Sequence, residues 1–200
     1  MSTYLYDEAL LEKLNNWTSG LSDMHIYGTE ETRRLYEVVA QSTDDEPIRL
    51  PMVCLRRNSG FEILRTGKVP MEYIGVTLES DTEKSTKLKA IPINIEYQLD
   101  VYCKLYKEAD SYLREFIFNF INYPTLKIKI PYNDANYIHK ANIRISDNVE
   151  DNSDVPERLI KGQFTRLSLS LNIDDAYLWD VSKKQNKSIS DTDIEIVEGV

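Results

Sequence analysis

The longest regular alternation of apolar and polar residues runs from Ile91 to Cys103. Every second side chain in this stretch is apolar, which is typical of a β-strand whose two faces have different surroundings. Thirteen such residues predict a strand about 40 Å long, whereas about five or six residues is the norm. We expect its apolar face to contact the core and its other face to contact water or a partner. The polar positions of that second face are Asn94, Glu96, Gln98, Asp100 and Lys104.

Two segments have the spacing of amphipathic helices. The first lies between Tyr4 and Trp17, where apolar residues recur every three or four positions. The second, residues 106–122, directly follows the long strand and ends before Pro124. We expect it to cover the apolar face of the sheet with one broad stripe. The predicted stripe comprises Ala109, Tyr112, Leu113, Phe116, Ile117, Phe120 and Ile121.

Shorter extended segments occur on both sides of the long strand. Residues 58–60 have turn chemistry, so segments 48–55 and 61–64 are expected to pair as a hairpin. Pro51 favours an edge position for the first of these, or a missing ladder bond. Residues 31–41 fit a helix or a strand. Residues 81–89 and 147–158 are polar and predict exposed loops. The remaining predicted strands are 24–29, 71–80, 125–133, 136–146 and 164–174.

Together these elements predict an α+β domain over residues 1–180, built from a mostly antiparallel sheet that one or two helices cover. Residues 181–200 are polar and predict a flexible acidic C-terminal tail. Within that tail Ile194, Ile196 and Val197 form a small apolar group. Such a group suits the addition of a strand to a neighbouring subunit's sheet edge, with plain disorder as the alternative.

The charge balance bears on possible partners. Among 200 residues, 33 are acidic and 24 are basic, and the net charge of −9 disfavours nonspecific binding to nucleic acid. We expect no specific nucleic-acid binding either. The sequence starts without a basic segment followed by an apolar run, and it contains no window of about 20 apolar residues. We therefore expect a soluble cytosolic protein that does not contact membranes. Cys54 and Cys103 both fall on predicted strands and are expected to be buried thiols.

Residue types that carry catalysis or bind metals occur without the required spacing. The seven glycines do not form a phosphate-binding loop. His25 and His139 lack a second histidine or cysteine at ligand spacing. The acidic residues between 147 and 154 lack the glycine on which a calcium loop turns. The sequence therefore predicts no catalytic residue, no cofactor and no metal site, and it favours a protein that is not an enzyme.

A basic group is the densest positive feature of the chain. Arg56, Arg57, Arg65 and Lys68 lie on or beside the expected hairpin, between acidic regions. This group suits a complementary acidic patch on the next subunit, with a mixed-charge surface as the alternative. The 13 tyrosines also favour interfaces, where side chains are partly apolar and partly wet. The interface candidates are Arg56, Arg57, Arg65, Ile194, Ile196 and Val197.

The order of these elements resembles that of the tail sheath terminator, or tail-completion, proteins in the neck of contractile-tailed bacteriophages. The resemblance covers about residues 22–180 and rests mainly on "IRLPMVCLRR", "IPINIEYQLDVYCKLYKEADSYLREFIFNF" and "FTRLSLSLNIDDAYLWD". An N-terminal amphipathic helix followed by a strand adds to it. Residues 30–41 have no obvious counterpart, and the chain lacks the long proline-rich C-terminal extension of some members.

This resemblance implies a structural protein of the virion tail. It implies a ring of identical subunits, expected to be a hexamer, that terminates the tail tube or sheath and joins it to head-tail connector proteins. DNA would pass through a lumen that carboxylates keep free of bound phosphate. The alternatives are a baseplate or head-tail adaptor protein and, from another class, a small ligand-binding or enzyme domain. Whether the ring terminates the tube or the sheath stays open.

Overall fold

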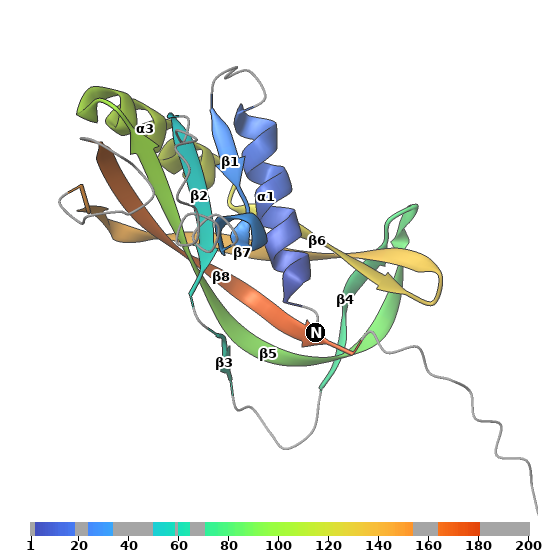
Figure 1. The fold of residues 1–200 in the computed structure, drawn as a ribbon. Coiled ribbons are helices and arrows are strands. Elements are labelled where there is room, and N and C mark those ends of the chain that lie inside the picture. The colour runs from blue at the N-terminus through green and yellow to red at the C-terminus, as the bar shows by residue number, and fades with distance from the viewer. Residues whose placement is uncertain are drawn as a thin grey trace, which may run out of the picture.

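The structure is a computed structural model that describes residues 3–18, 24–33, 50–58, 60–64, 71–153 and 164–180. Within them one sheet of eight strands lies against two long helices (Figure 1). The helices are α1 (Tyr4–Thr18) and α3 (Tyr106–Asn122), and residues 29–33 are also helical. The strands are β1 (His25–Tyr27), β2 (Met52–Arg57), β3 (Glu62–Ile63), β4 (Met71–Leu78), β5 (Asp81–Cys103), β6 (Thr125–Tyr132), β7 (Ala135–Asp151) and β8 (Thr165–Trp179).

Strand β5 organises the sheet because it has neighbours along both sides. At Ala90 it pairs with Met71 of β4 and with Trp179 of β8, so these two strands lie on opposite sides of β5. Strand β8 continues along one side of β5 as far as Cys103. On the other side β2, β3 and β4 follow one another, each antiparallel to β5. The parallel pair β1–β2 forms the end of the sheet there.

Strand β7 closes this arrangement into a circuit. Ile138 pairs with both β6 and β4, and Asn142 pairs with both β6 and β8. A strand has one neighbour on each side, so β4 and β8 both lie on the side of β7 that faces away from β6. The pairings β5–β8, β8–β7, β7–β4 and β4–β5 therefore form a closed ring of four strands. Among the described strands, β6 is left at an outer edge.

Three predictions about the strands are corrected. Segments 48–55 and 61–64 do not form a hairpin, because β2 and β3 pair with successive parts of β5. Nor is β2 at the edge, since it lies between β1 and β5, with Pro51 just before it. Residues 81–89 and 147–151 belong to β5 and β7 rather than to loops. Polar residues can form strands when partners satisfy their backbone groups, and β4 and β8 supply those partners.

Both long helices pack on the same face of the sheet (Figure 1). The main core joins Leu10 and Leu14 of α1 to Leu113 and Phe120 of α3, together with the inward side chains of β5, β6, β7 and β8. The rings of Trp17 and Phe120 meet edge to face at 4.9 Å. The fold is therefore the predicted α+β class, with a mostly antiparallel sheet covered by helices.

Cys54 and Cys103 are both buried free thiols, which confirms that prediction. They lie on opposite faces of the sheet: Cys103 belongs to the main core, whereas Cys54 packs with Met52 and Tyr102 on the other face. Burial raises the pKa of Cys103 to about 12. Among the described residues, no helix has the length and apolarity that crossing a membrane would require. The predicted tail, residues 181–200, lies outside the described part of the chain.

Candidate functional site: the outer face of helix α3

Helix α3 has two apolar sides. Ala109, Leu113, Phe116 and Phe120 recur at three and four positions and are buried against the sheet, as predicted. Ile121 was expected in the same stripe but is 59% exposed, which corrects that prediction. Successive helical residues are about 100° apart, so Ile121 turns away from the sheet where Phe120 faces it.

The second apolar side flanks the buried stripe. Phe118 is 60% exposed, and it lies beside Ile121 because residues three apart on a helix are neighbours. Tyr106 at the start of the helix is 57% exposed. We call Tyr106, Arg114, Ile117, Phe118 and Ile121 the outer face of α3. The sequence signal for it was present in "FIFNFI", which has too many apolar residues for a single stripe.

A groove of about 400 Å³ continues this surface between α3 and the ends of β7 and β8. Its lining includes Tyr106, Arg114, Ile117, Val149, Asp151 and Leu167. Val149 is 44% exposed although it lies on a strand. The groove therefore combines apolar walls with one cation, Arg114, and two carboxylates, Asp110 and Asp151, which is the composition of many protein interfaces.

The predicted basic interface group is only partly visible in the described residues. Arg57 faces α1, where its Nη1 lies 3.1 Å from Oδ2 of Asp7. Arg56 is on the opposite face of β2 and donates a 2.7 Å hydrogen bond to Gln98. Both guanidinium groups thus have partners within their own chain. The remaining interface candidates, Arg65, Ile194, Ile196 and Val197, lie outside the described residues, as does Lys68.

Asp7 ties helix α1 to the sheet. The hydroxyl of Tyr97 donates a 2.6 Å hydrogen bond to the same carboxylate that meets Arg57. Burial raises the pKa of Asp7, while the hydrogen bond from Tyr97 and the charge of Arg57 act against that rise. The three side chains come from α1, β5 and β2, so the contact fixes the helix across two strands.

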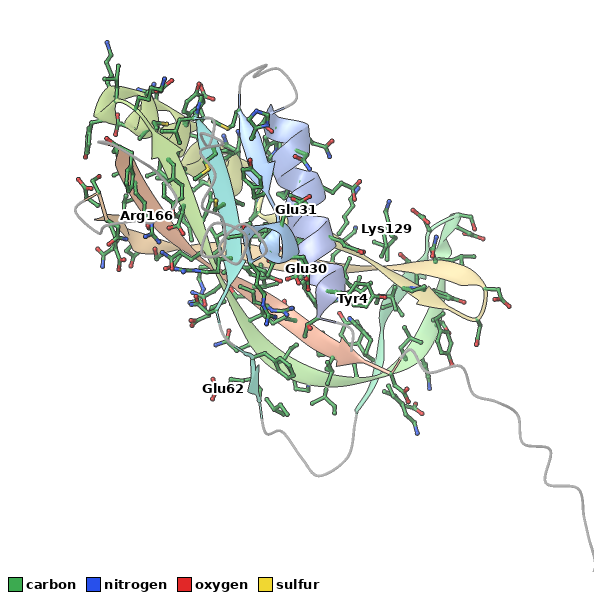
Figure 2. All side chains as sticks on the ribbon, viewed as in Figure 1. Tyr4, Glu30, Glu31, Glu62, Lys129 and Arg166 are labelled. Carbon is green, nitrogen blue, oxygen red and sulfur yellow. The ribbon has the colours of Figure 1, made fainter. Side chains whose placement is uncertain are left out.

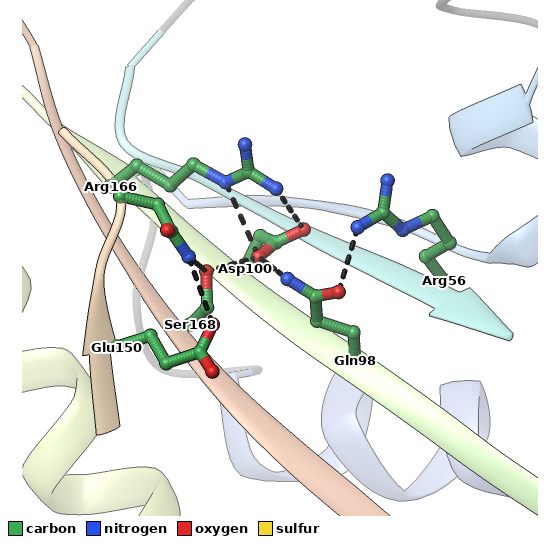
Figure 3. A network of polar contacts seen from close by, with 7 residues as sticks. Arg56, Gln98, Asp100, Glu150, Arg166 and Ser168 are labelled. Atoms are coloured by element: carbon green, nitrogen blue, oxygen red, sulfur yellow. Dashed lines mark hydrogen bonds and ion pairs between the residues drawn. The ribbon is translucent and has the colours of Figure 1, made fainter. Parts of the chain in front are cut away.

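The face of the sheet opposite the two helices contains a buried ionic network (Figure 3). Arg166 of β8 lies 3.2 Å from Oδ2 of Asp100 on β5, and Ser168 donates a 2.6 Å hydrogen bond to that carboxylate. Gln98 donates a further hydrogen bond of 2.9 Å. Asp100 is 1% exposed and Arg166 is 6% exposed, so the expectation that the polar face of β5 meets water or a partner is wrong at Asp100. The ion pair instead compensates charges that burial would penalise.

Aromatic side chains pack around a buried histidine beside the closed ring of four strands. His139 is 0% exposed, and the rings of Tyr73, Tyr177 and Trp179 lie within 5.0–5.4 Å of its centroid. Its Nε2 donates a 2.7 Å hydrogen bond to the carbonyl of Asp175, because a backbone oxygen can only accept. Burial lowers the pKa of His139, and its contact with Asp175 acts in the opposite direction.

The path of β4 makes room for this cluster. A bulge separates Tyr73 from Val76 in the pairing with β5. A Cβ at Gly75 would lie 2.6 Å from Cε1 of the Tyr73 ring, so a side chain there would displace the ring. On the other side of the cluster, Tyr6 of α1 donates to the carbonyl of Tyr177 at 3.0 Å and accepts from its N–H at 2.7 Å. The sequence showed only that His139 lacks a second metal ligand at suitable spacing, and its aromatic neighbours, which come from other strands, were not predicted.

Within the described residues, no group of three or more His, Cys, Asp or Glu side chains is placed to hold a metal ion. No protein-family model matches this chain, and no curated protein sequence matches it significantly.

Proposed function

We propose that the chain is a structural subunit of the neck of a contractile phage tail and works by assembling into a ring rather than by catalysis. The outer face of α3 carries this proposal. Phe118 and Ile121 expose about three fifths of their surfaces on a helix whose other side already supplies the core. Contiguous apolar surface of this kind marks interaction sites in soluble proteins.

The surroundings of these residues support an interface between protein chains. Leu105 is 67% exposed and Tyr123 is 62% exposed, so apolar side chains continue beyond both ends of the helix. The groove beside α3 adds a concave surface with Arg114 and Asp151 at its rim. Interfaces commonly combine an apolar centre that contains aromatic residues with a polar border.

A ring follows if the outer face of α3 meets a different surface of the next copy. Such a head-to-tail contact repeats from subunit to subunit and closes when the rotation allows it. By its resemblance to tail terminators, the ring is proposed to be a hexamer. Its other partners would be the last tube or sheath ring and the head-tail connector. A net charge of −9 is suited to a channel through which DNA passes without being held.

The test is a pair of matched variants of α3. Phe118→Ser with Ile121→Ser removes the exposed apolar side chains. Glu115→Ser with Asn122→Ser alters exposed residues elsewhere on the same helix. We expect light scattering and negative-stain images to show rings for the unchanged chain and for the Glu115/Asn122 control, and monomers for the first variant. Rings that persist unchanged in the first variant would overturn the role of this face. A monomer whose melting temperature rises with a metabolite would favour the ligand-binding class.

A further inference from the structure

We infer that the outer edge of β6 binds residues 191–197 of a neighbouring copy as an added strand. This inference rests on the proposed assembly of the chain with itself, and it specifies a second contact between subunits. The observations are the direction of the backbone groups of β6, the charges along that strand, and the matching pattern of the C-terminal segment.

The outer edge of β6 pairs with no strand in the described part of the chain. The N–H of Ile143 donates to the carbonyl of Pro124 at 2.8 Å, so the backbone groups of Pro124 point toward β7. Successive residues of a strand alternate in direction, so those of Thr125, Lys127 and Lys129 point away from β7. The Thr125 carbonyl accepts a 2.9 Å hydrogen bond from Lys13 of α1. Within the described part of the chain, β7 is the only strand that pairs with β6.

Positive charge gathers along this edge. Lys127 lies directly opposite Lys140 in the β6–β7 pair. Two like charges in this position repel each other and destabilise the pair. Among the described residues neither of these lysines has an ion-pair partner. The pKa of Lys13 is lowered by burial and by the charge of Lys127. Lys129, labelled in Figure 2, is 3.8 Å from Glu79 in an exposed pair. In a chain with a net charge of −9, this concentration of lysines calls for an anionic partner.

Residues 191–197, "DTDIEIV", have the complementary pattern. Along β6, Lys127 and Lys129 alternate with buried Ile128 and Ile130. In an extended 191–197 segment, Asp193 and Glu195 would alternate with Ile194 and Ile196 in the same way. A strand with this alternation can pair with β6 in the parallel or the antiparallel direction. In both cases its carboxylates lie beside the lysines and its isoleucines lie beside the apolar positions. Opposite charges across neighbouring strands stabilise such pairs.

The same features explain why this edge would be selective. Lysine and proline on an edge strand discourage pairing with unrelated strands, and β6 carries both, with Pro131 in an outward position. An acidic strand is the exception, because its carboxylates attract the lysines of β6. Residues 181–190 can extend about 33 Å beyond β8, so the segment has the length to reach the next subunit. Insertion into a neighbour is a head-to-tail contact of the kind that builds rings.

The experiment uses full-length chains with exchanged charges. One variant carries Lys127→Glu and Lys129→Glu, the other carries Asp193→Lys and Glu195→Lys, and Lys87→Glu with Lys89→Glu is a control that alters exposed lysines on β5, away from β6 and α3. We expect each of the first two to weaken self-association at least about tenfold, equivalent to about 1.4 kcal/mol. An equal mixture of the two should restore association, because each tail then finds an edge of opposite charge on the other chain. The control should associate as the unchanged chain does.

Residue-resolved hydrogen exchange in the same samples reports on the edge itself. The amides of Lys127 and Lys129 should be protected in the associated chain and exchange faster after residues 188–200 are deleted, while Ile128 and Ile130 keep their protection through β7. Equal exchange at Lys127 and Lys129 with and without the tail would overturn the inference. If rings still form in that case, the proposed function stands without it. Protection that persists in a monomer would mean that the tail docks on its own chain, which overturns the contact between subunits.

Discussion

Helices α1 and α3 cover the same face of one sheet, but they differ in what they present to the outside. On α1, the buried side includes Leu5, Leu10 and Leu14, and the large apolar residue exposed on this helix is Tyr4, at its first position. On α3, a comparable buried stripe is joined by Phe118 and Ile121, which face outward. The fold uses the inner sides of both helices, and we propose that the additional apolar residues of α3 serve a contact outside the chain.

The helices also differ in how they are fixed. Within the described residues, α1 is joined to the strands by polar contacts from Asp7 to Arg57 and Tyr97, from Tyr6 to the backbone of Tyr177, and from Lys13 to the carbonyl of Thr125. The inner side of α3 is held through apolar packing that includes its edge-to-face contact with α1. The two helices should therefore respond alike to loss of core packing and differently to changes of polar contacts, of pH and of the outer surface.

The largest expected effect is the one that the helices share. Leu10→Ala should lower the free energy of unfolding by about 2–5 kcal/mol and Phe120→Ala by about 3–5 kcal/mol, because each leaves a cavity in the same core. Urea denaturation followed by circular dichroism measures both. If either substitution costs less than about 1 kcal/mol, that helix does not hold the core together as described.

Tyr6→Phe should affect α1 specifically. The change removes a hydroxyl that both donates to and accepts from the backbone of Tyr177, so two partly buried backbone groups lose a partner. We expect a loss of about 1–3 kcal/mol in the free energy of unfolding. Hydrogen exchange should become faster in α1 and stay the same in α3. Equal acceleration in both helices would show that Tyr6 does not anchor α1 alone.

Low pH should destabilise the aromatic cluster that Tyr6 of α1 contacts, because it protonates His139. Its pKa is lowered from 6.5 by burial, so the unfolded chain binds a proton more readily than the folded chain does. The stabilising contribution of His139 is therefore complete above pH 6.5 and is lost as the pH falls through the lower pKa of the folded state.

His139→Gln tests this direction of the pH dependence of stability. Glutamine keeps an N–H donor for the Asp175 carbonyl but does not titrate. The drop in urea midpoint between about pH 7.5 and about pH 5 should be smaller for the variant than for the unchanged chain. An identical drop in both chains would assign the acid sensitivity to other groups.

The sequence predicted the repeating elements well and their neighbours poorly. Alternation between Ile91 and Cys103 and helical spacing in 106–122 identified the central strand and its covering helix, because local periodicity directly reflects burial on one side. It could not show that Asp81–Lys89 extends the same strand, since those polar residues depend on β4 for pairing. Nor could it show that Asp100 meets Arg166, which lies 66 positions away in the chain.

The candidate site was also predicted only in part. The residues of the outer face of α3 were visible in the sequence, but helical spacing assigned Ile121 to the core because the stripe was drawn too wide. Arg56 and Arg57 were singled out for charge density, which does not reveal that Gln98 and Asp7 already bind them. Contacts between distant segments set both outcomes, and periodicity contains no information about such contacts.

The outer face of α3 should have the smallest effect on stability and the largest on assembly. Replacing Phe118 and Ile121 together by serine should change the free energy of unfolding by no more than about 0.5 kcal/mol per site, because both side chains are exposed. The decisive measurement is the mass of the unchanged chain and of this variant by light scattering across concentration, with images of any large species. The account predicts rings for the unchanged chain and a folded monomer for the variant. Rings of equal stability in both, or an unchanged chain that stays monomeric at every concentration, would contradict it.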